Sequence, residues 1–563
     1  MNRNEILAQI KNNPEVSVLI VGAGINGIGT FRDLTLNSVD VLLVDRADFC
    51  SGASAASSHM AHGGIRYLEN GEFRLVREAV RERNRMIQNA PHIVSPLPTT
   101  IPMFKYFSGL LNAPLKFLGW LDKPSERGSV IIKLGLMMYD AYTGQTRTVP
   151  RHKFFSRAQS LKRWNRLNPE IANTAVYYDG LISNPERLAL ELVLDAEAEN
   201  PNARALNYVS MVSGEKDTIT LRDELSGETF EVHPKLVINA AGPWIDLTNR
   251  SLGLSTRYLG GTKGSHIVLD NPELRTAIGG NEFFFENKDG RIVLIFPLHD
   301  RVLLGTSDIK IENPDDVRCT DEEVDYFLEL IAHVFPTIKV TRAQIVFRFT
   351  GVRPLGSSGA KTTGQYSRDH HIEVLNGDWT NLNFPIYSLV GGKWTSFRAF
   401  SELVTDKALN FLNLSRQKST SELAIGGGRG YPKNEEDHRK HIESLAAWTG
   451  FNKDHLEQLF KRYGTRTQTV ADFMMRAADS PLNSLPTYTR REIIFLVQYE
   501  KVRHLDDLIL RRTMLAMLGR LTKDIILELA EILGESLNWD EEQRNAEMAR
   551  TLHLLSDRHG VKL

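Results

Sequence analysis

Residues 17–45, SVLIVGAGINGIGTFRDLTLNSVDVLLVD, decide the fold of this chain. A short apolar run leads into the glycine-rich turn Gly22-Ala23-Gly24-Ile25-Asn26-Gly27, a helical pattern follows to about Asn37, and a second apolar run occupies 39–45. Short apolar strands are typical of parallel sheets covered on both faces. The segment therefore predicts a strand–helix–strand unit of an α/β domain.

Three glycines and one acid of this unit indicate a dinucleotide site. Gly22 permits a tight turn, Gly24 lets the backbone approach a pyrophosphate, and Gly27 lets the helix pack on the strand. The helix N-terminus supplies N–H groups and partial positive charge for the phosphates. Asp45 ends the second strand, 23 residues after Gly22, where a carboxylate accepts hydrogen bonds from ribose hydroxyls. Because an acid favours an unphosphorylated ribose, we expect FAD or NAD rather than NADP.

The composition of the 563 residues excludes several classes of protein. Charged residues make up 24%, hydrophobic residues 42%, and the net charge is −1, unlike a disordered chain or a basic nucleic-acid binder. Cys50 and Cys319 are too few for a disulfide framework or a four-cysteine metal site, and they fit a reducing compartment. At about 150 residues per domain, the length predicts roughly three to four domains.

Changes in the sequence pattern also divide the chain. The middle is rich in strand-like runs, one of which leads into NAAGPW at 239–244. A helix with one apolar side is expected at about 72–89. A glycine-rich linker at 426–432 precedes a charged, helical pattern that begins near residue 434, which indicates a separate helical domain.

One segment bears on membrane contact. The N-terminal residues contain acids and lack an apolar stretch, so no signal peptide is expected, and the chain has no run of about 18 apolar residues that would predict a transmembrane helix. Residues 101–123, IPMFKYFSGLLNAPLKFLGWLDK, mix aromatic and aliphatic side chains with lysines. Such a segment can lie in a bilayer interface or pack as an amphipathic element on its own protein, and Pro114 interrupts a single long helix.

Several motifs resemble those of the FAD-dependent glycerol-3-phosphate dehydrogenase family. SSxxxHGGIRYL at 57–68 and NAAGPW at 239–244 carry the resemblance first. It extends, in family order, through KGSH at 263–266, GTSD at 305–308, GVRPL at 351–355, SRD at 367–369, GGKWTS at 391–396 and DDLILRRT at 506–513. Trp394 departs from the smaller residue expected at its position. The motifs cover roughly residues 17–515.

The resemblance implies an α/β fold with a Rossmann-like FAD-binding domain of the glutathione-reductase and D-amino-acid-oxidase type, a mixed-sheet substrate domain and a C-terminal helical domain. We place the FAD-binding domain at 1–100, 175–255 and 349–425, the substrate domain at 101–174 and 256–348, and the helical cap at 430–563. We expect non-covalent FAD to contact Gly22, Gly24, Gly27, Asp45, Ser54, Ser57, Ser58, His62, Gly63, Ala241, Gly242, Gly391 and Gly392.

The activity implied by the resemblance is oxidation of sn-glycerol 3-phosphate at its secondary carbon to dihydroxyacetone phosphate, with the hydride passing to the flavin. A phosphate dianion needs several cationic donors, and the planar fork of arginine binds it bidentately. By resemblance, Arg66 and Arg368 contact mainly the phosphate, with Tyr67 nearby, whereas Arg353 and Lys393 lie at the reacting centre. No metal is expected.

Alcohol oxidation also needs a group that takes the hydroxyl proton. His62 is one candidate because imidazole titrates near neutral pH, and His266 and Lys393 are the others. His266 and Thr306 are also expected to contact the substrate, although the turn containing Thr306 is equally typical of an ordinary hairpin exit. Positive charge from Arg353 or Lys393 would stabilise an anionic reduced flavin.

The electron acceptor remains to be assigned. Oxygen-using members of the family carry an insertion between GVRPL and GGK, whereas 40 residues separate Arg353 from Lys393 here, which favours the dehydrogenase branch. The resemblance then implies a membrane quinone as acceptor and a cytoplasmic protein held peripherally at the inner face of the membrane, with 101–123 as a membrane contact. A homodimer is the candidate assembly. The alternatives are an oxidase that forms hydrogen peroxide, an amine-oxidising relative, and a flavoprotein scaffold without activity. No nucleic-acid partner is expected.

Overall fold

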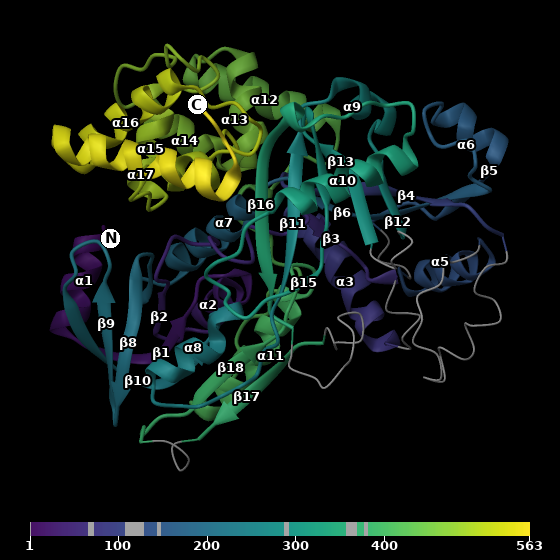
Figure 1. The fold of residues 1–563 in the computed structure, drawn as a ribbon. Coiled ribbons are helices and arrows are strands. Elements are labelled where there is room, and N and C mark those ends of the chain that lie inside the picture. The colour runs from purple at the N-terminus through teal and green to yellow at the C-terminus, as the bar shows by residue number, and fades with distance from the viewer. Residues whose placement is uncertain are drawn as a thin grey trace.

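Two β-sheets and a C-terminal group of helices make up the described part of the protein (Figure 1). The computed structural model describes residues 2–65, 72–106, 129–143, 148–286, 292–355, 369–376 and 381–563. Helices lie against both sheets, so the α/β class predicted from the sequence is confirmed.

The predicted strand–helix–strand unit forms the centre of the first sheet. β1 (Glu15–Val21) leads through the glycine turn into α2 (Ile25–Leu36) and β2 (Val41–Val44), and the two strands pair in parallel. β1 also pairs in parallel with β10, and β10 with β18, so the C-terminal ends of these strands meet at one edge. The strand order is β17–β18–β10–β1–β2–β7, with β7 (Ala203–Leu206), β10 (Thr229–Asn239), β17 (His371–Leu375) and β18 (Ile386–Val390).

Both faces of this sheet are covered, which explains the apolar character of its central strands. Val18 and Ile20 of β1 pack into a core shared with α2, α7 and α11, whereas Leu19 and Val21 pack into a second core on the opposite face. Successive side chains of a strand point to opposite faces, so a doubly covered strand needs apolar residues at every position. The covering elements are α1 (Arg3–Asn12), α7 (Pro185–Glu199), β8 (Val209–Glu215), β9 (Thr218–Asp223) and α11 (Phe397–Phe411).

The second sheet is mixed and larger. β4 pairs in parallel with β12, whereas the other recorded pairs are antiparallel. Its strands β3–β6 lie between β2 and β7 along the chain, and β11–β16 lie between β10 and β17, so the two sheets are interwoven along the chain. The domain boundaries given above remain predictions. The strands are β3 (Met60–Ala61), β4 (Val94–Met103), β5 (Lys153–Ser156), β6 (Asn173–Ile182), β11 (Thr262–Leu269), β12 (Glu282–Glu286), β13 (Ile292–Leu298), β14 (Arg301–Gly305), β15 (Ile309–Lys310) and β16 (Ile345–Arg353).

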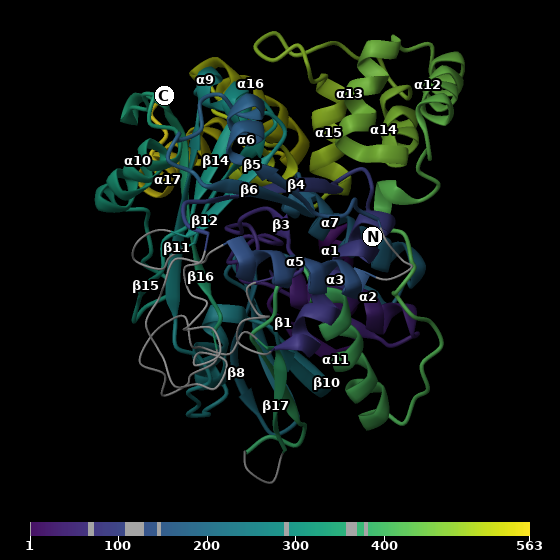
Figure 2. The same cartoon turned by 90° about the vertical axis from the view of Figure 1, so that its right-hand side faces the viewer.

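Helices from three parts of the chain cover the second sheet. The predicted helix at 72–89 is present as α3 (Phe73–Asn89), and it packs with α5 (Ser129–Thr143) over β4 and β6. A separate core lies against β11, β13 and β14 of the same sheet, and it includes Phe327 and Ile331 of α10 (Asp321–Val334). Figure 2 shows α3 and α5 side by side on the outside of the molecule.

The C-terminal helices cover the face of the second sheet opposite α10, which is the face on which α3 and α5 also pack. Phe347 and Phe349 of β16 share one apolar core with these helices. None of the helices within the described ranges is both long and apolar enough to cross a membrane. The C-terminal elements are α12 (Glu435–Thr449), α13 (Lys453–Tyr463), α14 (Thr467–Met474), α15 (Arg490–Tyr499), the π-helical turn η8 (Asp507–Arg512), α16 (Lys523–Leu537) and α17 (Glu541–His559).

Candidate active site

The glycine turn lies where β1, β2 and β10 end. Gly22 has a φ of 107°, and a Cβ at this position would lie 2.6 Å from the backbone oxygen of Ala240. A Cβ on Gly27 would collide with the Gly22 carbonyl. Gly24 precedes α2 without a side-chain cap, so the first turn of the helix opens onto this edge of the sheet. A helix N-terminus reached through a glycine turn fits a pyrophosphate.

Asp45 directly follows β2 and faces the glycine turn. Its carboxylate accepts hydrogen bonds from the backbone N–H of Ala23 (2.6 Å) and of Ala47 (2.9 Å). Burial raises the pKa of Asp45 to about 6, although both N–H donors act in the opposite direction. This is the position that the sequence predicted for a ribose-binding acid.

FAD affinity is expected to rise with pH through about 6. In the predicted complex the Asp45 carboxyl accepts ribose hydrogen bonds best when it is ionised, so we expect FAD to bind the deprotonated form more tightly and protonation below the pKa to weaken binding. Fluorescence titration of apoprotein with FAD between pH 5 and 8 measures this step, and Asp45→Asn should remove it. An affinity that is equal at pH 5 and pH 8 would contradict the assignment.

Two predicted glycines after β18 complete the edge of the first sheet at which β1, β2 and β10 end. Gly391 and Gly392 have φ values of 78° and 98°, and a Cβ on Gly392 would collide with Asn26 in the first turn of α2. The Asn26 side-chain amide donates to the Gly391 carbonyl (3.2 Å). The turn that carries Lys393 is therefore fixed against the N-terminus of α2. Lys393 itself is half-buried, and its charge helps burial to lower the pKa of His370.

Ala241 and Gly242 lie beside the glycine turn that contains Gly22. Ala241 donates its backbone N–H to the Asn239 side-chain oxygen (3.2 Å), and a Cβ on Gly22 would lie 2.7 Å from the Ala241 nitrogen. Gly242 has a φ of 55° and begins the short 3₁₀ turn Gly242–Trp244. The structure therefore brings the predicted residues at 241 and 242 close to the glycine turn.

The serine-rich segment, residues 51–58, lies between β2 of the first sheet and β3 of the second. Ser54 Oγ accepts from the Ile25 N–H at the start of α2 (3.0 Å), and the Trp394 indole donates to the Ser54 carbonyl (2.9 Å). Trp394, which departs from the family pattern, thus secures this segment. Ser57 Oγ accepts from the His59 N–H (3.3 Å). Ser58, predicted at the cofactor, has its hydroxyl 2.8 Å from Nε2 of His266 on β11.

A buried polar cluster holds the turn that contains His62. Gly63 donates its N–H to the Asp179 carboxylate (2.9 Å), and the Tyr139 hydroxyl donates to the same oxygen (2.5 Å). Arg83 donates to the Tyr139 hydroxyl (2.7 Å). Asp179, Tyr139 and Arg83 are all buried, and His62 beside them is half-buried. Sequence reasoning missed these three residues.

The residues predicted in three separate motifs meet around Arg353 at the end of β16. Its guanidinium donates to Thr306 Oγ1 (2.9 Å), to the Ser307 carbonyl (2.9 Å) and to the Asp308 carboxylate (3.0 Å). A Cβ on Gly264 would collide with the guanidinium, so the KGSH strand needs glycine there. These contacts join GVRPL, GTSD and KGSH in one cluster.

His266 lies behind this cluster and is fully enclosed. Its ring stacks on Phe349, with the ring centres 4.8 Å apart and the planes 7° from parallel. Burial, followed by the positive charge of Arg353, lowers the pKa of His266 to about 3. The imidazole is therefore neutral at physiological pH, with Nε2 against the Ser58 hydroxyl.

Some predicted positions lie outside the described residues. These are Arg66, Tyr67, Arg368 and residues 107–123 of the aromatic and lysine-rich segment. Its described beginning, residues 101–106, completes β4 and continues to Lys105 and Tyr106, which are both exposed.

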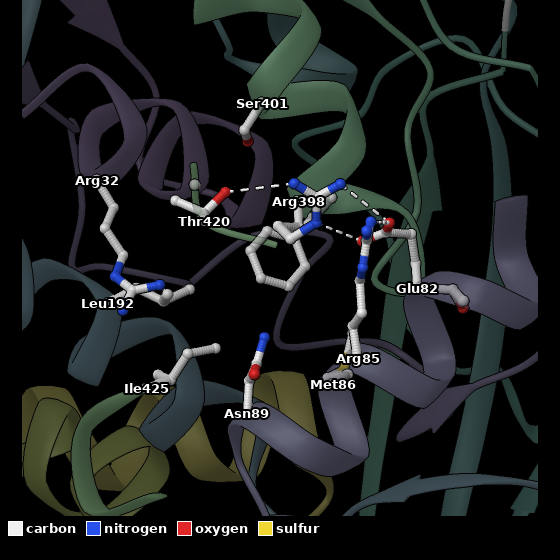
Figure 3. A pocket seen from close by; sticks show the side chains of 13 residues that line it. Arg32, Glu82, Arg85, Met86, Asn89, Leu192, Arg398, Ser401, Thr420 and Ile425 are labelled. Atoms are coloured by element: carbon white, nitrogen blue, oxygen red, sulfur yellow. Dashed lines mark hydrogen bonds and ion pairs between the residues drawn. The ribbon is translucent and has the colours of Figure 1, made fainter. Parts of the chain in front are cut away.

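A pocket behind the glycine turn lies between α2, α3 and α11 (Figure 3). Arg398 of α11 donates to both carboxylate oxygens of Glu82 on α3, at 2.6 and 3.0 Å. None of the residues predicted for the site lines this pocket. The buried ion pair instead fixes α11, and with it the Gly391–Lys393 turn, relative to α3.

Comparisons with known proteins agree with this geometry. Residues 17–384 match the family of FAD-dependent oxidoreductases, and residues 418–544 match the C-terminal domain of alpha-glycerophosphate oxidase. The X-ray structure of the glycerol-3-phosphate dehydrogenase from Bacillus halodurans, complexed with FAD, superposes with a TM-score of 0.76 at 22% identity and covers 98% of this chain and 97% of its own. The fold and the glycine-lined edge thus define a FAD-dependent oxidoreductase, and FAD is its cofactor.

Curated relatives narrow the family. A glycerol-3-phosphate dehydrogenase of Synechocystis sp. is 32% identical over 95% of this chain and 96% of its own length. The aerobic glycerol-3-phosphate dehydrogenase of Bacillus subtilis is 27% identical over 96% of this chain and 94% of its own. The chain belongs to the FAD-dependent glycerol-3-phosphate dehydrogenase family.

Proposed function

We propose that this protein oxidises sn-glycerol 3-phosphate to dihydroxyacetone phosphate and passes the electrons to a membrane quinone. The observation that carries the proposal is the cluster in which Arg353 contacts Thr306, Ser307 and Asp308. The half-buried guanidinium of Arg353 lies on the second sheet. The serine-rich segment connects this sheet to the FAD-binding edge of the first sheet. The curated relatives named for this activity match over nearly the whole chain.

Arg353 binds and orients the substrate in this proposal. Thr306 and Asp308 hold its guanidinium in one orientation, which lowers the entropy cost of positioning a substrate oxygen. Asp308 also neutralises part of its positive charge. Arg66, Tyr67 and Arg368 are proposed to contact the phosphate, as the resemblance implies.

His62 takes the hydroxyl proton. FAD, when bound, accepts the hydride that leaves the secondary carbon of the substrate. His266 is a poorer acceptor, because its pKa is lowered to about 3 and its Nε2 already faces the Ser58 hydroxyl. The Asp179 cluster fixes the backbone next to His62, so the imidazole is positioned by a buried scaffold. Lys393 supplies positive charge at the same turn as Gly391 and Gly392.

Anaerobic mixing of the FAD-loaded protein with glycerol 3-phosphate tests the function. The flavin absorbance should bleach, and a soluble quinone should restore it much faster than oxygen does. Lack of bleaching at saturating substrate would contradict the proposed oxidation. Stoichiometric hydrogen peroxide with oxygen as the preferred acceptor would instead assign the protein as an oxidase.

The outer face of α5 supports contact with a membrane surface. Val130, Leu134 and Met137 lie on one side of this helix with 45%, 62% and 54% of their surface exposed. The helix begins beside Lys105 of the 101–123 segment, since Ser129 donates its N–H to the Lys105 carbonyl (3.3 Å). An exposed apolar stripe of this kind is typical of helices that lie in a bilayer interface.

Basic residues border the α5 stripe (Val130, Leu134 and Met137). Arg77 of the neighbouring α3 lies over the Tyr142 ring of α5 at 5.6 Å, and Arg74, Arg77 and Arg81 are exposed along one side of α3. Apolar side chains flanked by arginines are complementary to an anionic lipid surface. A bilayer contact at this face would bring the quinone to the protein without a membrane span.

Replacing Leu134 by glutamate is expected to lower binding to phosphatidylglycerol-containing vesicles by roughly tenfold, because the variant places a charge where an apolar side chain enters the interface. Vesicle co-sedimentation measures the binding, and activity with a soluble acceptor should not change. Leu527→Glu is the control, since Leu527 is 46% exposed on α16, in the C-terminal helices. Equal loss of binding in both variants would overturn the assignment of this face.

A further inference from the structure

A buried ion-pair cluster joins the C-terminal helices to the loop that follows Asp45. Asp48 has no exposed surface, and both of its carboxylate oxygens accept from the Arg512 guanidinium, at 2.7 and 2.9 Å. Nε of Arg511 donates to one of these oxygens as well (2.6 Å). Both arginines belong to η8, in the DDLILRRT motif, for which the proposed reaction has no use.

Loop 45–50 is attached to the glycine turn at both ends. Asp45 accepts the Ala23 N–H, as described above, and Cys50 donates its N–H to the Ala23 carbonyl (2.9 Å). Asp48 lies in the middle of the loop and accepts hydrogen bonds from Arg511 and Arg512 of the C-terminal helices. The Asn207 side chain also donates to it (2.8 Å). A movement of Asp48 would therefore be transmitted to the carboxylate and to the backbone of the FAD-binding turn.

The two arginines are themselves fixed by other groups. Arg511 also donates to Asp506 (2.8 Å) and Asp507 (2.5 Å). Arg512 donates its Nε–H to the Glu500 carbonyl (2.8 Å). The positive charges beside it hold the pKa of Asp48 well below its usual range, so the carboxylate stays ionised and paired despite its burial. Bidentate arginine contacts add directional precision as well as attraction.

We propose that Asp48, Arg511 and Arg512 form a clamp through which the C-terminal helices hold loop 45–50 in the shape that binds the adenosine end of FAD. Asp48, Arg511 and Arg512 are positioning residues in this assignment, because they act through Asp45 and the glycine turn. Retention of FAD then depends on the C-terminal helices, although those helices lie on the other sheet. The inference rests on the cofactor alone and not on the substrate or the electron acceptor.

A second buried pair at the same interface offers a matched control. Arg187 of α7 binds Glu500 through two contacts, at 2.5 and 2.8 Å, and both side chains are almost fully buried. This pair connects the C-terminal helices to α7 and not to loop 45–50. The contact of Glu500 with Arg512 is made by a backbone oxygen, which substitution of the Glu500 side chain keeps.

The test compares Asp48→Asn with Glu500→Gln in the full chain, with FAD loaded and no substrate present. The dissociation rate of FAD is followed by its fluorescence, and the Tm of each apoprotein is measured by circular dichroism. Both substitutions remove one charge from a buried pair, so both should lower the Tm. Asp48→Asn is expected to speed FAD release by about tenfold, and Glu500→Gln by less than about twofold.

Equal FAD release from the two variants at a similar loss of Tm would overturn the clamp and leave a purely structural role. Should Asp48→Asn fail to fold, Arg512→Lys decides the question, because it keeps the charge but loses the bidentate fork. It is expected to speed FAD release by about threefold, with a smaller loss of Tm than Asp48→Asn because the charge is kept. FAD release at the parental rate from a folded Arg512→Lys protein would also overturn the proposal.

Discussion

Replacing Arg353 by methionine is expected to lower kcat/KM for glycerol 3-phosphate by about a thousandfold, which corresponds to about 4 kcal/mol of transition-state stabilisation. Methionine keeps much of the length of the side chain but removes the donors that Thr306 and Asp308 hold in place. Both the orientation of the substrate and the positive charge beside its reacting oxygen would be lost. Steady-state kinetics with a soluble quinone measure the effect.

Arg348 provides a matched control on the same strand. Its side chain is 29% exposed, against 27% for Arg353, and it pairs with Asp321 rather than with the GTSD turn. Arg348→Met should change kcat/KM by less than about threefold, because a surface ion pair contributes little. Comparable losses in the two variants would mean that the effect of Arg353 comes from the stability of β16.

Replacing His62 by alanine is expected to lower kcat by about a thousandfold and to leave KM for glycerol 3-phosphate within a few-fold of the parent value, as for loss of a general base. The rate of anaerobic flavin bleaching should fall by the same factor. Steady-state and stopped-flow kinetics give both quantities.

His266→Gln separates the two histidines. The buried imidazole of His266 is neutral at physiological pH, and glutamine can still hydrogen-bond to the Ser58 hydroxyl. The variant should keep most of its kcat. A loss of kcat by about a thousandfold in His266→Gln, with a nearly parental kcat in His62→Ala, would reverse the assignment of the proton acceptor.

The first sheet could be predicted from the sequence because its signal is local. Gly22, Gly27 and Asp45 lie within 24 residues of one another, and each has a steric or hydrogen-bonding requirement that the structure shows directly. The strand and helix boundaries agree to within a few residues. Parallel pairing follows from doubly covered apolar strands, so local pattern and tertiary structure agree here.

The candidate site could be predicted only in part. The residues around Arg353 were expected from resemblance, and their mutual contacts come from pairing between β11, β14 and β16, which no local pattern encodes. Asp179 was missed because an aspartate inside a strand gives no sign of its partners, and those partners lie 40 and 116 residues away. The contact of the Ser58 hydroxyl with His266 was not expected from the sequence, and the contact of Ser58 with the cofactor stays a prediction.

The interwoven sheets also constrain the order in which the protein is completed. β18 supplies the turn at Gly391 and Gly392, and it pairs with β10, which leaves the ribosome about 150 residues earlier. A nascent chain that ends before residue 392 therefore has the glycine turn of β1 but lacks its opposite wall. The two walls of the FAD-binding edge are therefore both present only after about two thirds of the chain has been made, and termination before residue 392 yields a chain that lacks one of them.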